Sequence, residues 1–198
     1  MRFAPAGTRE HYLDITLGMS QPIASGRTAS QWEFAVYSLM RKRWQPQLLY
    51  DLVTHFIVED EEPAEGDWLP LVFFEDHKGS MACGLTEKPT KSPIGEIRGL
   101  YLWPDYHTPA FPLSTGRFRL MVAVAVTKDE DEAAREASPP HLLALLRRLG
   151  LGLFSDPFRK SAFTLRNAAE YWRIVRRRTR AEVISELSVL DLHSVTGV

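Results

Sequence analysis

One stretch, residues 116–126 (GRFRLMVAVAV), constrains the fold of this chain more than any other. Every second residue from Phe118 to Val126 is apolar, and the alternate positions begin with two arginines and become apolar after Arg119. This period of two predicts a β-strand in the middle of a sheet, with its C-terminal half covered on both faces. Thr127 and Glu130 follow at the spacing of a capping box, so we expect the strand to pass directly into a helix.

The residues before this strand predict further strands and one helix. The expected strands are residues 11–20, 32–40, 68–74, 81–86 and 95–104. In the first of them, Leu13, Ile15 and Leu17 share one face. Apolar residues at helical spacing predict an amphipathic helix over residues 46–57 that packs on the sheet.

The residues after the central strand predict helices instead. A short acidic helix is expected at 129–137, and Ser138-Pro139-Pro140 opens a leucine-rich helix that Gly150 ends. A third helical segment runs from Thr164 to about Leu187, and the capping-box spacing of Thr179 and Glu182 predicts a break near Arg178.

These elements indicate an α+β fold, a mixed or antiparallel sheet with helices packed against it, because strands and helices do not alternate regularly. We divide the chain into an α+β domain at 1–161 and a C-terminal helical extension at 162–198. The extension either packs on its own domain or pairs two chains in a dimer, and the sequence leaves the oligomeric state open.

Composition excludes several classes of protein. The 198 residues carry a formal net charge of -1, which gives no global signal for nucleic acid or an anionic membrane. No apolar run approaches the roughly 18 residues of a membrane span, and the N-terminus lacks the apolar core of a secretory signal. Cys83 is the single cysteine. We therefore expect a cytoplasmic domain with no metal, no cofactor and no membrane contact.

Known catalytic and nucleotide-binding patterns do not occur in the sequence. The six histidines form no metal-binding pair, and GxxxxGK[ST], GxGxxG and GxSxG are absent. One enzymatic alternative remains, a hydrolase or transferase site around Asp76, His77 and Cys83. The apolar strand around Cys83 favours a buried, inert thiol instead, because a reactive thiolate needs an accessible, electropositive setting. We expect no enzymatic activity.

Two acidic runs are the most distinctive charged features. The first comprises Glu59, Asp60, Glu61, Glu62, Glu65 and Asp67 in a predicted loop, and the second spans 129–132. A solvated surface explains such runs by default. The alternative is a recognition surface for a basic partner protein, because complementary charge accelerates association and discriminates between partners.

The sequence also contains one basic cluster, the arginines of residues 173–180. They form a solvated helix face by default, or dock on the acidic body of this or another chain. Few aromatic residues are interleaved with them, which disfavours nucleic acid as their partner.

Three stretches resemble, in their order, segments of the Suppressor of fused family. The first, WEFAVYSLMRKRWQPQLLYDLVTHFI, is similar to a strand-then-helix unit of that family, and the second is Gly66-Asp67-Trp68 with the following strand. The third is VAVAVTKDEDEAAREASPPHLLALLRR together with FSDPFRKS. Its matching positions are Thr127, 129–132, Ala133, Ala134, 142–147, Asp156, Pro157 and 159–161.

The resemblance covers about residues 9–161 and implies an α+β domain that binds proteins and does no chemistry. Eukaryotic members sequester a transcription factor, and stand-alone bacterial members are proposed as immunity proteins that neutralise toxins. The chain departs from the family pattern in two places: SPPH stands where a tryptophan precedes the leucine-rich helix, and residues 164–198 match no family segment.

The sequence therefore favours a bacterial immunity-type protein that binds and neutralises a partner, with a basic toxin domain as the expected ligand. The first acidic run is the expected contact surface. A general interaction module that sequesters a transcription regulator is the main alternative, and the hydrolase or transferase site is the other.

Overall fold

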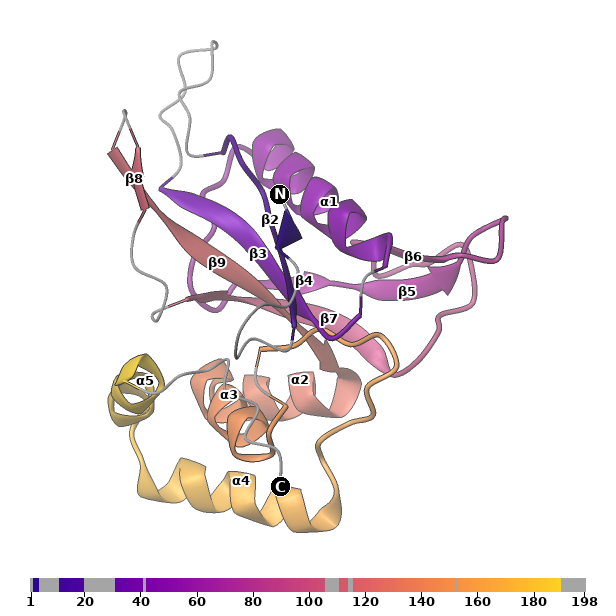
Figure 1. Ribbon diagram of the computed structural model, residues 1–198. Coiled ribbons are helices and arrows are strands. Elements are labelled where there is room, and N and C mark those ends of the chain that lie inside the picture. Colours follow the sequence, from indigo (N-terminus) through magenta and orange to yellow (C-terminus); the bar gives the residue numbers. More distant parts are fainter. Residues whose placement is uncertain are drawn as a thin grey trace.

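The computed structural model describes residues 2–3, 11–19, 31–40, 42–105, 111–113, 116–151 and 153–189 (Figure 1). The main sheet contains β1 (Arg2–Phe3), β2 (Tyr12–Ile15), β3 (Trp32–Ser38), β4 (Trp68–Pro70), β7 (Ile97–Pro104), β8 (Phe111–Leu113) and β9 (Gly116–Thr127). A small separate sheet pairs β5 (Val72–Glu75) with β6 (Met81–Gly84). The helices are α1 (Trp44–Glu59), α2 (Lys128–Glu136), α3 (Pro139–Arg148), α4 (Leu165–Arg177) and α5 (Arg180–Val189).

The predicted central strand is β9, which lies in the middle of the main sheet. The strand order is β1-β2-β3-β9-β7-β4, and β8 also pairs with β9. β9 runs parallel to β3 and antiparallel to β7. Strands that pair in both directions make this a mixed sheet, so the predicted α+β class is confirmed.

The two faces of β9 enter two separate hydrophobic cores. Val122, Val124 and the other residues on their face of the strand pack with α2, α3, α4 and α5. Met121 and Ala123, on the opposite face, pack with α1. Figure 1 shows this layering, with α1 above the sheet and the C-terminal helices below it. Burial on both faces is what the run of apolar residues in this strand predicted.

The C-terminal helices pack on their own chain. Tyr171 and Ile174 of α4 and Val183 and Leu187 of α5 are buried in the same core as the lower face of β9. The predicted break is present at Arg178 and Thr179, where Glu182 accepts a hydrogen bond from the Thr179 backbone N–H at 2.7 Å. Thr127 and Glu130 also form their predicted capping box at the start of α2.

Two strand predictions were wrong in their extent. The segment 68–74 divides at Leu71: β4 pairs with β7 as far as Pro70, opposite Gly99, and from Val72 the chain pairs with β6 instead. The first predicted strand ends at Ile15, and Leu17 is 56% exposed rather than on a buried face. Strands β1 and β8 were not predicted, because they have two and three residues.

The residues after Leu153 close a gap in the main sheet. β3 and β9 pair only as far as Ala35 and Val122, and beyond that point the two strands diverge. Ser155 lies between them: its N–H donates to the Tyr37 carbonyl at 2.9 Å, and its Oγ bonds both the Ala123 carbonyl and the Ala125 N–H. A side chain thus satisfies β9 backbone groups that a neighbouring strand would otherwise bind.

Arg159 and Glu130 form a buried ion pair next to this closure. The guanidinium donates to both Glu130 carboxylate oxygens, at 2.5 and 2.7 Å, and to the Ala125 carbonyl at 2.9 Å. The Glu130 carboxylate also accepts from the N–H groups of Thr127 and Ala162. One carboxylate therefore joins β9, α2 and the segment that leads to α4.

Candidate protein-binding surface

The structure gives no catalytic arrangement of Asp76, His77 and Cys83. Cys83 is buried, its thiol donates to the Trp44 carbonyl at 3.5 Å, and burial raises its pKa far above the ordinary value. The Asp76 carboxylate stabilises a turn by accepting hydrogen bonds from the N–H groups of Ser80 and Lys78, and these bonds lower its pKa. His77 is exposed. A thiol with a raised pKa is a poor nucleophile, so these residues offer no hydrolase or transferase site.

The buried histidines of the described segments have packing roles. The His141 ring joins the start of α3 to the α4–α5 break, with Nδ1 2.5 Å from Ser138 Oγ and Nε2 3.0 Å from the Arg178 carbonyl. His11 packs edge-on against Tyr37 and Phe154. In the part of the chain that the structure describes, no cluster of His, Cys, Asp or Glu has a metal-binding arrangement. No helix there combines the length and the apolar surface that crossing a bilayer requires.

Two of the four residues in the second acidic run have structural roles, while Asp129 and Glu132 are exposed. Glu130 is completely buried in the ion pair with Arg159. The Asp131 carboxylate accepts from the Tyr101 hydroxyl at 2.8 Å and from Arg135, which also lies over the Trp68 ring. The expectation of a solvated charge run at 129–132 was therefore wrong at its two central residues. Their carboxylates satisfy donors at the start of α2 and along β7.

The first acidic run lies at the C-terminal end of α1 and in the loop that follows. Glu59, Glu61 and Glu62 are exposed, and so is Asp60, which ends the helix in a left-handed conformation with φ 57°. The other two residues have structural partners. Glu65 pairs with Arg180 at 3.8 Å, and the Asp67 carboxylate accepts from the Ala64 N–H at 2.7 Å. Of the six predicted contact residues, the first four are therefore exposed, and the carboxylates of Glu59, Glu61 and Glu62 are available to a partner.

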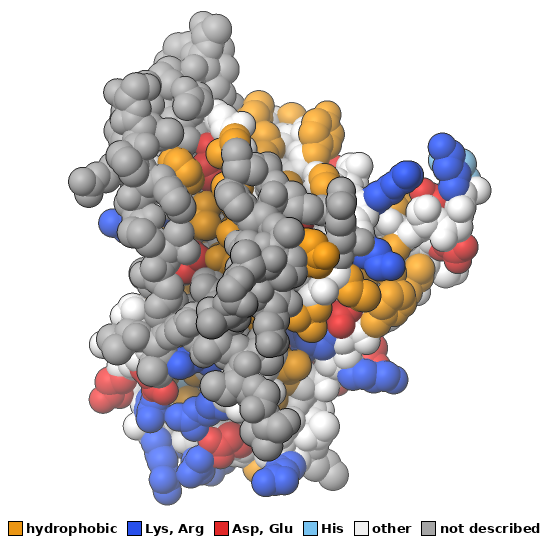
Figure 2. All heavy atoms as spheres, in the orientation of Figure 1, with side chains coloured by type: hydrophobic (Ala, Val, Ile, Leu, Met, Phe, Trp, Pro, Cys, Tyr) orange, Lys and Arg blue, Asp and Glu red, His pale blue; other side chains and the backbone are white. Residues whose placement is uncertain are grey.

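An exposed apolar stripe on α1 leads to these four residues. Tyr50, Ile57 and Val58 are 67%, 44% and 71% exposed. Their spacing of i, i+7 and i+8 puts them on one side of the helix, opposite the buried stripe of Leu48 and Leu52. Figure 2 shows hydrophobic side chains gathered at this end of the molecule, over α1.

Sequence reasoning missed this stripe because it assigned the helix a single apolar face. The signal was present: tyrosine, isoleucine and valine recur at helical spacing away from the buried leucines. A helix that is apolar on two sides has more apolar surface than one sheet can cover. We call Tyr50, Ile57, Val58 and residues 59–62 the α1 surface.

The backbone N–H groups of Asp60 and Glu61 cap the Phe56 carbonyl, but the carboxylates of residues 59–62 do not stabilise the helix. A helix C-terminus carries a partial negative charge, so acidic side chains there are unfavourable. The last turn of α1 contains no basic residue that would offset them. Carboxylates placed against the helix dipole and next to exposed apolar residues match an interface with a polar rim and an apolar centre.

Comparison with known proteins shows the fold. The Drosophila Suppressor of fused structure matches with a TM-score of 0.62 and 16% identity, over 87% of this chain and 44% of that chain. A structure of the Sufu–Fu complex matches with the same TM-score and identity, over 90% of this chain and 81% of that chain. No protein-family model matches the sequence, and no relative is found among curated proteins.

The chain thus has a Suppressor of fused-like fold, as the resemblance of its motifs implied. It spans less than half of the Drosophila chain. Those motifs serve the architecture rather than an exposed surface. Ser155 and Arg159 close the gap beside β9, and the Gly66 N–H donates to the Leu102 carbonyl at 2.9 Å to align β4 with β7.

Proposed function

We propose that this protein is a non-enzymatic protein-binding module and that the α1 surface is its contact site. The observation that carries the proposal is the pairing of an exposed apolar stripe with the exposed carboxylates of Glu59, Glu61 and Glu62. The fold supports it as well, since one of the matching structures is a Sufu–Fu complex.

The partner is a basic protein, which the α1 surface occludes. Residues 59–62 create a negative field that steers a cationic surface toward α1 and raises the association rate. Tyr50, Ile57 and Val58 then lose their water to the partner and provide most of the affinity, as buried aromatic and aliphatic residues do at interface centres. Binding of this kind needs no chemical step by the protein.

The first test measures association with a partner captured from the native host. Glu59→Gln, Glu61→Gln and Glu62→Gln together remove three charges without changing side-chain shape. We expect the association rate at low salt to fall about tenfold and to lose most of its salt dependence. The matched control removes three exposed charges from α2, with Asp129→Asn, Glu132→Gln and Glu136→Gln. Equal rates in the two variants would place the contact elsewhere.

The apolar stripe has its own readout. Tyr50→Ala should raise the dissociation rate while leaving the association rate nearly unchanged, because it removes contact area without removing charge. Tyr50 is mostly exposed in the free protein, so its replacement leaves the fold intact. A Tyr50→Ala variant that binds as tightly as the parent would contradict the role of this stripe.

The more specific proposal is that the partner is a toxin and that the protein neutralises it in the cytoplasm. This part rests on the resemblance to bacterial immunity-type members of the family. Expression of the captured partner alone should arrest growth, and co-expression of this protein should restore it. A harmless partner that still binds the α1 surface would reject the toxin proposal and leave the binding proposal standing.

A further inference from the structure

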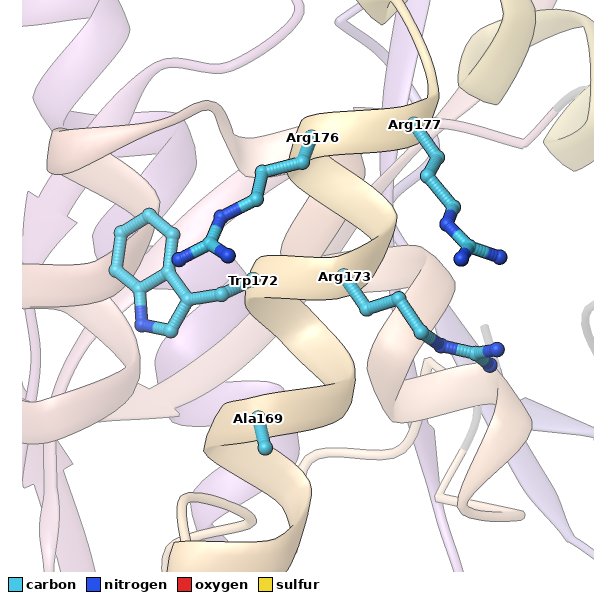
Figure 3. A pocket seen from close by; sticks show the side chains of 5 residues that line it. All are labelled: Ala169, Trp172, Arg173, Arg176 and Arg177. Atoms are coloured by element: carbon cyan, nitrogen blue, oxygen red, sulfur yellow. The ribbon is translucent and has the colours of Figure 1, made fainter.

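A second charged surface lies on the far side of the molecule from α1, along the outer face of α4. Two neighbouring hollows there share Ala169 and Arg173 in their lining, and we call the two together the groove. The first hollow, of about 360 Å³, is shown in Figure 3. Trp172 and Arg176 project to one side of the helix and Arg173 and Arg177 to the other. The second hollow, of about 640 Å³, extends to Leu145 and Arg148 of α3.

The groove is strongly positive. Five arginines line it against one acidic residue, Glu170. The lining arginines are Arg148, Arg166, Arg173, Arg176 and Arg177. Glu170 pairs with Arg148 at 2.8 Å and with Arg173 at 2.6 Å, and the Arg173 bond lowers its pKa. Within the described segments Arg166, Arg176 and Arg177 have no ion-pair partner.

Helix stability explains only part of this arrangement. Arg176 and Arg177 lie in the last turn of α4, where a helix dipole favours cations. Arg166 lies in the first turn, where the dipole disfavours a cation, and no acidic residue accompanies it there. Tyr171 and Ile174 of α4 are buried, and Trp172 and Val175 pack partly against the same core, so core packing accounts for these residues but not for the arginines. An arginine placed against the dipole points to a ligand.

We propose that this groove binds an acidic polypeptide segment of a partner protein. The Glu170 carboxylate, held between two guanidinium groups, shows that the groove has the geometry to bind a carboxylate. At about 1.5 Å per residue the 13 residues of α4 extend roughly 20 Å, which matches about six residues of an extended peptide. Half-buried Trp172 gives an apolar contact for a side chain between the carboxylates.

A peptide fits the groove better than a nucleic acid does. The negative charge of Glu170 lies in the groove and would repel a continuous phosphodiester backbone. A peptide can place its carboxylates on either side of that position. Base stacking on single strands uses several aromatic rings in succession, and Trp172 is the single aromatic residue that lines the groove.

Fluorescence anisotropy with a labelled peptide of about ten residues, alternating glutamate and serine, tests the proposal at low ionic strength. We expect Arg166→Gln, Arg176→Gln and Arg177→Gln together to weaken binding about tenfold or more, because three charge-assisted contacts are removed. The matched control neutralises three exposed lysines on and beside the β5–β6 hairpin, with Lys78→Gln, Lys88→Gln and Lys91→Gln, and should keep the parent affinity. A thermal melt of each variant confirms folding.

Three results would overturn the proposal. The first is peptide affinity that is the same in the arginine variant as in the parent. The second is an arginine-dependent preference for a single-stranded oligonucleotide of equal charge, which would make the groove a nucleic-acid site. The third is self-association of the parent, seen by sedimentation and lost in the arginine variant, which would make a second copy the occupant. None of these outcomes depends on the α1 surface, so the two proposals fail separately.

Discussion

The two acidic runs have similar composition and opposite structural roles. Residues 59–62 lie at the C-terminal end of α1 and are exposed, whereas residues 129–132 lie in the first turns of α2 and include a carboxylate with no exposed surface. The difference comes from their place on a helix. Carboxylates at a helix start meet free N–H groups and a partial positive charge, and carboxylates at a helix end meet the reverse.

This comparison separates charge that stabilises the fold from charge that remains available for binding. Glu130 and Asp131 are occupied by Arg159, Tyr101 and Arg135. Glu59, Glu61 and Glu62 are exposed and lie next to apolar residues that are also exposed. Substitutions in the second run should therefore change stability, and substitutions in the first should change association.

The largest effect is expected for Glu130→Gln. The substitution leaves the buried Arg159 guanidinium without its counter-charge, and breaking a buried pair on one side costs about 3 kcal/mol or more of unfolding free energy. Urea unfolding measures the loss. Glu132→Gln is the control in the same run, since its pair with Lys128 is exposed and contributes about 0.3–0.5 kcal/mol. Equal losses in the two variants would contradict the comparison.

A smaller effect is expected for Tyr171→Phe, which tests the contact between α4 and the acidic helix α2. The Tyr171 hydroxyl donates to the Ala133 carbonyl of α2 at 2.8 Å, and its removal should cost about 1 kcal/mol at neutral pH. Guanidinium unfolding of the two proteins gives the difference.

Alkaline pH gives Tyr171 a second signature. Burial raises the pKa of this residue to about 12, above the value of about 10 in an unfolded chain. The folded state then holds the proton more tightly, so this stabilisation is complete below about pH 10 and is lost as pH rises through about 12. Between these values the parent should lose stability more steeply than Tyr171→Phe, and parallel pH profiles would refute this assignment.

The smallest effect on stability is expected where the first run is neutralised. Glu59→Gln, Glu61→Gln and Glu62→Gln together should change the free energy of unfolding by less than about 0.5 kcal/mol, since exposed charges contribute little. Any change should be stabilising, because the substitutions relieve an unfavourable interaction with the dipole of α1. A loss above 1 kcal/mol would show that these residues have structural partners after all.

Local patterns predicted much of the fold. The alternation in 116–126, the helical spacing of Leu48 and Leu52 and the capping box at Thr127 each concern residues within a few positions of one another, and all three were confirmed. Such features depend on backbone geometry and neighbouring side chains, which a single sequence records directly.

Features that depend on distant partners could not be predicted. Nothing near Glu130 in the sequence indicates Arg159, and nothing near Pro70 indicates that the chain changes there from pairing with β7 to pairing with β6. The α1 surface could be predicted only in part. Its residues are visible in the sequence, but their exposure depends on which helix face the sheet covers.

The closure beside β9 has a consequence for synthesis of the protein. β9 is twelve residues long, and the groups that Ser155 and Arg159 satisfy belong to its buried C-terminal half. A nascent chain that has made β9 but not yet Ser155 presents an unpaired apolar strand edge, which is a template for aggregation. Productive folding on the ribosome must therefore wait for the segment after Leu153, or rely on a chaperone to shield that edge until the segment arrives.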